Sequence, residues 1–99
     1  MIDLATVTAD DFETLEDRRF ERVVAAGEPP LALTLTEVRR GRPRPTGRAP
    51  FALLLVGPAH LTLDQGIHPL RHASLGELEL FLTAVGGDAE TRTYEAVFG

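Results

Sequence analysis

Alternation of apolar and polar residues with a period of two runs through most of the chain and predicts β-strands. Strands are expected in the segments Phe20 to Ala25, Leu31 to Val38, Phe51 to Val56, Ile67 to His72, Leu78 to Val85 and Thr93 to Phe98. Pro69 lacks an N–H donor, so its strand is expected at a sheet edge or a bulge. About six strands with turn signals at short intervals predict a mainly β (β-rich α+β) fold, a small antiparallel barrel or sandwich.

One short helix is expected near the N-terminus, at about residues 9 to 16. Thr8 can cap it, and Asp10 and Asp11 fall in the first turn, where free backbone N–H groups favour negative charge. Phe12 and a leucine three residues later share one face. This narrow apolar stripe predicts a helix that covers an edge of the core.

A polar segment interrupts the strands between Arg39 and Pro50. It contains three prolines, two glycines and five arginines, a composition that disfavours both helix and central strand. We therefore expect a surface loop that joins the flanking strands into a long hairpin.

The last third of the chain predicts a second hairpin. Leu78 to Val85 and Thr93 to Phe98 alternate as strands, and the glycine-rich segment Gly86 to Arg92 between them has turn composition. The apolar positions of this hairpin are patterned for packing, so Phe98 is expected to be buried although it lies next to the last residue.

Length and composition fit a single β-rich domain over residues 1–99. The chain has 99 residues, of which 43% are hydrophobic and 25% charged, which is ordinary for a globular domain that folds alone. The longest apolar run, Ala49 to Gly57, is too short to span a bilayer, so no membrane partner is expected. Met1 to Asp11 lacks the basic and apolar regions of a secretory signal, which predicts synthesis in the cytoplasm.

Charge is distributed unevenly. The formal net charge is −5, and all ten basic residues are arginine. Half of them lie within ten residues and are the candidate partner-binding residues: Arg39, Arg40, Arg42, Arg44 and Arg48. Their guanidinium groups suit an acidic protein face or phosphates. The acidic remainder of the chain, with only Phe51 and Tyr94 as aromatic residues that could stack on bases, makes nucleic acid the less favoured partner.

Catalytic and metal chemistry find little support in the sequence. Cysteine is absent, which removes thiolate catalysis and cysteine-based zinc sites. On a strand, His68 and His72 would stand ~13 Å apart, too far to share one ion, so they are interpreted as hydrogen-bonding sheet positions. His60 is expected in a loop, and Ser74, the only serine, in a turn. We therefore expect no cofactor, no metal and no enzymatic activity.

The ordered motifs of the second half resemble those of a small bacterial family of uncharacterised domains. They are a strand that ends in Gly57-Pro58, then Gln65-Gly66, His72, Leu75-Gly76, Phe81-Leu82 and a closing Tyr94-Glu95-Ala96-Val97-Phe98. The similarity extends more loosely to Leu33, Leu35 and Val38. Two positions depart from the pattern: His68 replaces an aromatic residue, and Gly99 replaces an asparagine.

The resemblance implies no activity. It implies an association with phage-tail-collar-like proteins, and so a structural or adaptor role in a tail-derived or fibre-like assembly. The leading hypothesis is a non-catalytic module that binds protein or self-assembles, through an exposed sheet edge or the arginine loop. The alternative is a small barrel that binds a small molecule or nucleic acid near His60, His68 and the Arg39 to Arg48 loop.

Overall fold

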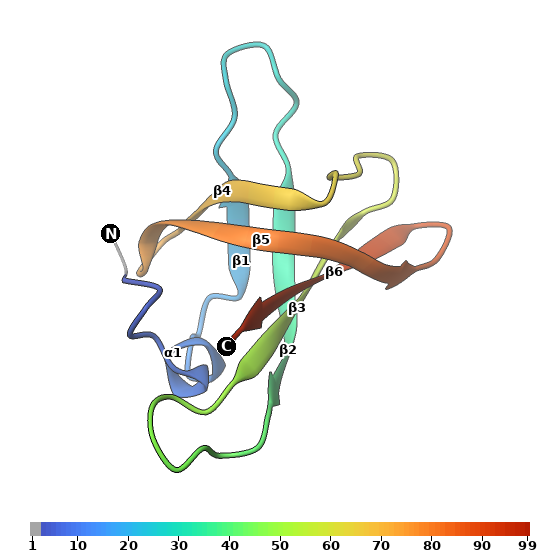
Figure 1. The fold of residues 1–99 in the computed structure, drawn as a ribbon. Helices are drawn as coiled ribbons and strands as arrows, with labels where there is room; N and C mark the ends of the chain where they lie inside the picture. The colour runs from blue at the N-terminus through green and yellow to red at the C-terminus, as the bar shows by residue number, and fades with distance from the viewer. Residues whose placement is uncertain (1–2) are drawn as a thin grey trace.

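Six antiparallel strands and one short helix make up the protein (Figure 1), whose computed structural model describes residues 3–99. The elements are α1 (Ala9–Glu13), β1 (Arg19–Arg22), β2 (Ala32–Arg40), β3 (Phe51–Pro58), β4 (Gly66–His72), β5 (Gly76–Gly87) and β6 (Thr91–Phe98). The β1–β2 and β2–β3 connections project from opposite ends of the sheet. The predicted β-rich fold with one N-terminal helix is confirmed.

The sheet closes on itself in the order β1-β2-β3-β6-β5-β4, so the fold is a barrel and not a sandwich. Two three-stranded meanders are joined by the pairing of β3 with β6, which extends over eight residue pairs from Phe51↔Phe98 to Pro58↔Thr91. The second junction, between β1 and β4, has only two pairs, Glu21↔Arg71 and Arg22↔Leu70. One seam of the barrel is therefore long and the other short.

Register shifts bend two of the strands. One lies between Leu35 and Glu37 in β2, and the other between Ala84 and Gly86 in β5. A bulge adds a residue to one strand only, which increases the local twist and curvature. Both bulges help a small sheet to close.

The core consists of the inward-facing positions predicted from the alternation. In β5, Leu78, Leu80 and Leu82 are buried, whereas Glu79 and Phe81 between them are exposed. The largest fully buried side chains are Tyr94, Phe12, Phe20, Leu33, Leu53, Leu55, Leu70 and Leu82. The Tyr94 hydroxyl accepts a hydrogen bond from the backbone N–H of Leu63 at 2.9 Å, which fixes the loop before β4.

The helix covers one end of the barrel. The Phe12 ring is fully buried, with its centroid 5.9 Å from that of Phe51 and 5.7 Å from that of Phe98. Phe51 and Phe98, partners across β3 and β6, stack at 4.5 Å with 6° between their planes. The helix thus forms the expected cover, and it packs on the first residue of β3 and the last of β6.

The helix begins where the sequence predicts and ends three residues early, at Glu13. The Thr14 hydroxyl donates to the Asp10 carbonyl at 2.7 Å, and the Arg18 guanidinium donates to the carbonyls of Glu13 at 2.7 Å and Leu15 at 3.0 Å. These side chains satisfy carbonyls that a longer helix would have paired internally.

In the described part of the chain, no helix is long and apolar enough to cross a membrane.

Arg39 and Arg40 are strand residues, which corrects the predicted loop. They pair with Ala52 and Phe51, so the connection comprises residues 41–50. The prolines begin only at Pro43, and the two arginines retain the N–H groups that extend the ladder.

Pro69 lies in a strand that is paired on both sides, so the expected edge position is wrong. The Pro69 carbonyl accepts from the Val23 N–H at 2.9 Å, which shows that the proline nitrogen also faces the β1 side. There β1 ends at Arg22, three residues before the predicted Ala25, and its last pair with β4 is Arg22↔Leu70. The missing donor thus coincides with the end of the short seam.

The closing hairpin has a shorter turn than predicted. Gly86 and Gly87 pair with Thr93 and Arg92, which reduces the turn to residues 88–90. The Asp88 carboxylate accepts from the backbone N–H groups of Glu90 and Thr91, both at 2.9 Å, and from the Thr91 hydroxyl at 3.1 Å. These bonds lower the pKa of Asp88 below its ordinary value, and the bond from the Glu90 N–H has the largest effect.

Replacement of Phe98 should be costly. We expect Phe98→Ala to lower the free energy of unfolding by about 3–5 kcal/mol, because it removes a ring stacked on Phe51 and leaves a cavity. The matched control is Val97→Ala, one residue away and 70% exposed, which should change the free energy by less than about 0.5 kcal/mol. Urea unfolding of both variants measures the difference, and equal effects would contradict the inward position of Phe98.

The lowered pKa of Asp88 predicts a pH dependence. Since the folded-state pKa lies below the unfolded value near 3.8, the charged carboxylate stabilises the fold above that pH, and the contribution disappears as the pH falls through the lowered pKa. Asp88→Asn should therefore be less stable than the wild type at neutral pH by an amount that shrinks below about pH 4. Urea unfolding from pH 7 to pH 2 tests this, and a constant difference would exclude the charge as the cause.

Candidate functional site

Arg48 is the most constrained of the five candidate arginines. Its Nη1 donates to the carbonyls of Leu4 at 2.9 Å and Val7 at 2.7 Å, and its Nη2 donates to the Gly99 carbonyl at 3.0 Å. One guanidinium therefore joins the N-terminal segment, the β2–β3 loop and the end of the chain. This arrangement uses the planar, forked donor set that distinguishes arginine from lysine.

Aromatic rings hold the same guanidinium. The Arg48 Cζ atom lies 5.5 Å from the ring centroid of Phe51 and 5.7 Å from that of Phe98, within the range of cation–π attraction. The Arg48 Nε is buried and has no hydrogen-bond partner among the described residues. Arg48 thus supports the aromatic cluster at the helix end of the barrel.

Two further arginines are engaged by acidic residues of the same chain. The Arg40 Nε donates to Glu13 Oε2 at 3.0 Å, and its Nη2 contacts both Asp10 and Glu13 of the helix. Hydrogen bonds to Asp10, which has the larger effect, and to Glu13 raise the pKa of Arg40 above its ordinary value. Arg39 forms an ion pair with Glu37 on its own strand.

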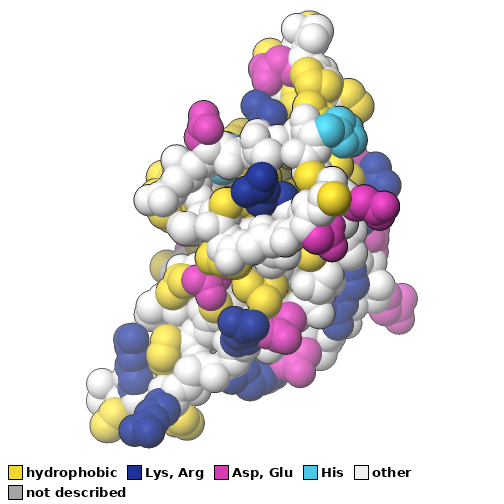
Figure 2. Space-filling view, turned by 90° about the vertical axis from the view of Figure 1, so that its right-hand side faces the viewer, with side chains coloured by type: hydrophobic (Ala, Val, Ile, Leu, Met, Phe, Trp, Pro, Cys, Tyr) yellow, Lys and Arg dark blue, Asp and Glu magenta, His cyan; other side chains and the backbone are white. Residues whose placement is uncertain are grey.

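Arg42 and Arg44 are the remaining members of the cluster. Both are exposed in the β2–β3 loop, and within residues 3–99 neither forms an ion pair or a hydrogen bond. Figure 2 shows arginine side chains at this lower end of the molecule. The aromatic residues expected to stack near such a groove are not available, because Phe51 and Tyr94 are buried in the core.

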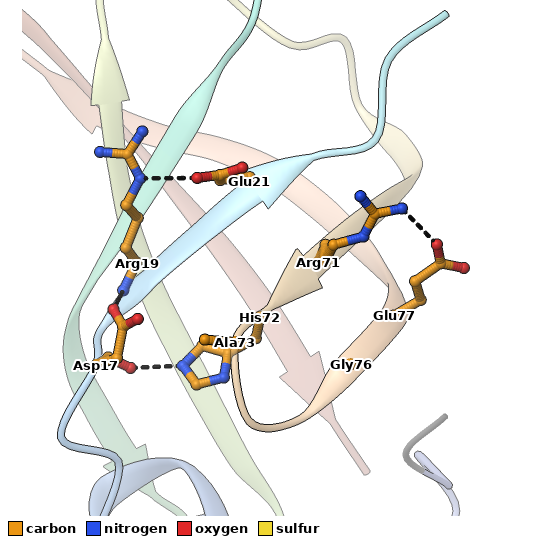
Figure 3. A pocket seen from close by; sticks show the side chains of 8 residues that line it. All are labelled: Asp17, Arg19, Glu21, Arg71, His72, Ala73, Gly76 and Glu77. Atoms are coloured by element: carbon orange, nitrogen blue, oxygen red, sulfur yellow. Dashed lines mark hydrogen bonds and ion pairs between the residues drawn. The ribbon is translucent and has the colours of Figure 1, made fainter.

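A charged pocket of about 430 Å³ lies where β1, β4 and the β4–β5 turn meet (Figure 3). Two ion pairs form its rim: Arg19 with Glu21 at 3.2 Å, and Arg71 with Glu77 at 2.7 Å. The four side chains are between 52% and 64% exposed, so water screens these pairs. The rim presents both charges in balance and no concentrated field of one sign.

His72 lies beneath this pocket and serves the fold. Its Nδ1 accepts from the backbone N–H groups of Ser74 at 3.0 Å and Leu75 at 3.2 Å, which places the proton on Nε2. The Nε2–H donates to the Asp17 carbonyl at 2.5 Å. The Ser74 hydroxyl also lies 3.2 Å from Nδ1, but two N–H groups already use that lone pair, so the two side chains do not form a nucleophile and base.

The other histidine positions agree with the sequence interpretation. His68 Nε2 lies 2.6 Å from the Asp64 carbonyl oxygen, a local hydrogen bond, and His60 is exposed in a turn. Among residues 3–99, no three histidine, cysteine or acidic side chains are grouped so as to hold a metal ion.

Exposed apolar side chains form a row across the outer face of the barrel. Ile67 of β4, Phe81 of β5 and Val97 of β6 are 65%, 52% and 70% exposed. Ile67 pairs with Phe81, and Val97 pairs with Ala52 of β3. We call Ile67, Phe81, Val97 and Ala52 the outer apolar row.

Two grooves flank Val97. On one side, a groove of about 250 Å³ is lined by Arg39, Arg40, Gly41, Pro50, Phe51, Ala52 and Val97. On the other, β5 and β6 diverge beyond the pair Thr83↔Glu95 (Figure 1). A groove of about 240 Å³ there is lined by residues of both strands, among them Phe81 and Val97. Although the sheet is closed, some strand sides lack a neighbour locally, as where β5 and β6 diverge beyond Thr83↔Glu95.

Phe81 and Val97 occupy outward-facing positions of the alternation in β5 and β6, where polar residues are expected. An apolar residue at an outward-facing strand position can mark a contact surface, but single exposed apolar residues are common on all protein surfaces. The registers show that Phe81 is paired with Ile67 and Val97 with Ala52, which the sequence alone does not reveal.

The fold and surfaces define a small closed antiparallel barrel with a helical cover and a few exposed apolar side chains on its outer face. A family model matches residues 7–98, and the chain belongs to that family, a domain of unknown function, DUF6916. Comparison with curated proteins found no match. Comparison with solved structures also found none.

Removal of the Arg48 side chain should destabilise the barrel. We expect Arg48→Ala to lower the free energy of unfolding by about 1–3 kcal/mol, because three carbonyls lose their donor and two rings lose a cation. Arg42→Ala, from the same loop, is the matched control and should change it by less than about 0.5 kcal/mol. Thermal and urea unfolding compare the two, and equal stability of both variants would refute the structural role of Arg48.

Proposed function

We propose that the protein is a non-catalytic structural or adaptor module that binds protein. The observation that carries this proposal is the outer apolar row, in which Ile67, Phe81 and Val97 are each more than half exposed. Exposed apolar side chains grouped on one surface are typical of protein contacts, where aromatic and aliphatic side chains form the centre and polar residues the rim.

The arginine cluster supports the same proposal with a smaller set of residues than the sequence suggested. Arg48, Arg40 and Arg39 have partners within the chain, whereas Arg42 and Arg44 project from the β2–β3 loop without one in the described residues. Exposed charges beside an apolar patch accelerate association and select complementary partners. We therefore assign Arg42 and Arg44 to the rim of the contact.

The pockets give less support to a small-molecule role. The charged pocket at β1 and β4 has a rim of exposed ion pairs, and its histidine is committed to backbone groups of the fold. Ligand sites usually combine an apolar cavity with a few unpaired polar groups directed into it.

A narrower proposal concerns the assembly in which the module acts. The resemblance of Phe81-Leu82 and the closing Tyr94 to Phe98 strand to a family associated with phage-tail-collar-like proteins supports a place in a phage-tail-like or fibre-like assembly. That association is the sole support for the narrower proposal, and it is independent of the surface argument.

Affinity purification from the native host tests the proposal. A Phe81→Asp variant should recover at least about tenfold less of the protein bound by the wild type, including any differently tagged copy of the chain, because a charge is placed in the centre of the contact. Val85→Asp is the control, since Val85 is also 52% exposed but lies near the hairpin tip, outside the row.

A second variant, Arg42→Ser with Arg44→Ser, tests the rim of the contact. It should reduce the amount of recovered partner less than Phe81→Asp does. Recovery of tail or fibre components would support the narrower proposal. A protein-binding role for this face would be contradicted if the wild type and Phe81→Asp recovered equal amounts of the partner. It would also be contradicted if the wild type recovered no protein specifically.

A further inference from the structure

We infer that the protein binds its partner by strand addition, with an extended segment of the partner lying along the side of β5 that faces β6. This mode of binding rests on the proposed function, because it specifies how a partner is held beside Phe81. Three features of the molecule carry it: the direction of the backbone groups in β5, the groove next to them, and the charge of Glu79.

The hydrogen bonds of β4 determine which backbone groups of β5 are free. Pro69 of β4 faces β1, because its carbonyl accepts from the Val23 N–H. In an antiparallel pair, the backbone groups of a residue and of its partner point either toward each other or away from each other. Glu79, the partner of Pro69, therefore directs its N–H and C=O groups away from β4. The alternation along the strand gives Glu77 and Phe81 the same direction.

The neighbouring strand does not pair with these three residues. The β5–β6 ladder ends at Thr83↔Glu95, so on that side they have no strand partner within residues 3–99. Figure 1 shows the start of β5 and the end of β6 apart. In the same described range, no hydrogen bond joins the N-terminal segment around Leu4 to β5. Unpaired backbone donors and acceptors in a row are a template for an added strand.

The groove of about 240 Å³ beside this edge receives the side chains of the added strand. Glu79 and Phe81 line it on one side and Val97 on the other, together with buried apolar residues such as Leu80 and Phe98. Antiparallel pairing with β5 is the more stable direction. It places two partner residues outward, opposite Glu79 and Phe81, and the residue between them inward, opposite Leu80. The inward residue must be apolar, because a buried polar group without a hydrogen bond is costly.

Glu79 determines the charge of the segment. Its side chain is exposed and forms no ion pair or hydrogen bond among the described residues, whereas Glu77 is already paired with Arg71. Opposite charges directly across two strands stabilise their pairing, and like charges destabilise it. A basic partner residue therefore belongs opposite Glu79. The net charge of −5 also favours the approach of a basic segment.

The same carboxylate disfavours a second copy of this chain as the added strand. The antiparallel register that pairs the most free residues of two β5 strands places Glu79 opposite Glu79, a repulsive contact. The partner is therefore a different protein with an extended segment of defined order. From its N-terminal side, the segment carries an apolar residue opposite Phe81, an apolar residue opposite Leu80 and a basic residue opposite Glu79.

Amide hydrogen exchange, followed by NMR on the purified protein, tests the free edge. After correction for intrinsic rates, the N–H groups of Glu79 and Phe81 should exchange at least about tenfold faster than those of Leu78 and Leu80, which face β4. Equal protection of the two sets would overturn the inference.

A short synthetic peptide tests recognition by the wild-type protein. It carries phenylalanine, valine and arginine in succession between threonines, and its titration should shift the β5 amide signals to saturation. Methylation of the arginine backbone nitrogen should weaken binding by about tenfold or more, because that N–H faces β5. Methylation of the valine nitrogen, whose N–H faces away from β5, is the matched control and should change binding by less than about twofold. Absence of saturable binding, or equal losses for the two methylated peptides, would overturn strand addition.

Charge reversal tests the role of Glu79. Glu79→Arg should weaken binding of the peptide by about fivefold or more. Glu90→Arg makes the same change in net charge at the exposed hairpin turn and should have an effect below about twofold. Equal effects of the two variants would overturn the basic residue assigned opposite Glu79.

Affinity purification with Glu79→Pro separates this inference from the proposed function. Proline is tolerated where the N–H faces no strand, so the variant loses a free donor without losing a bond to β4. Loss of the recovered partner in both Glu79→Pro and Phe81→Asp would support strand addition. A partner lost in Phe81→Asp but retained by Glu79→Pro would overturn strand addition and leave the proposed function standing.

Discussion

The pairing of β3 with β6 is the constraint on which the rest of the molecule depends. It joins the first meander to the second along the long seam, and without it the sheet would be open, with one unpaired side on β3 and one on β6. The stacked rings of Phe51 and Phe98 terminate this ladder at one end, and the helix rests on them through Phe12. The long seam, the aromatic cluster and the helical cover therefore form one cooperative unit.

Closure also determines where function can reside. Side chains fill the interior of the barrel, among them the fully buried Leu55, Leu82 and Tyr94. Closure also reduces the free strand edges, which are the usual site of strand addition, to local stretches such as the β6 side of β5 before Thr83. Most of the exposed surface is the outer face of the barrel and the loops.

Local sequence signals predicted the elements well and their spatial relations poorly. Alternation around Leu80 and Tyr94 was sufficient to give strands and core faces, because a period of two reports which side chain points inward. It does not report which strands are neighbours, so the pairing of Phe81 with Ile67 and of Val97 with Ala52 became visible only in the structure. The same limitation explains Pro69, whose missing donor is harmless because the β1–β4 seam ends beside it.

Composition was a still weaker guide to the candidate site. Five arginines in ten residues indicated one basic loop, but the structure assigns them three different environments. Arg39 and Arg40 extend a strand, Arg48 turns inward to the carbonyls of Leu4 and Gly99, and only Arg42 and Arg44 remain in the exposed loop. Charge density along a sequence cannot distinguish a cation that binds a partner from one that supports its own fold.

The hydrogen bonds of Arg48 have a consequence for chain connectivity. Because a single guanidinium holds the carbonyls of both Leu4 and Gly99, the first and last parts of the described chain meet at one point. The entropy of closing a loop depends on how far apart its ends must be held, and here the fold has already brought them together. A short peptide between these two positions would make the chain circular with little strain, and the exposed loop around Gly47 could then supply new ends. The backbone path is therefore nearly circular, and the Arg48 guanidinium bridges the two segments that no peptide bond joins.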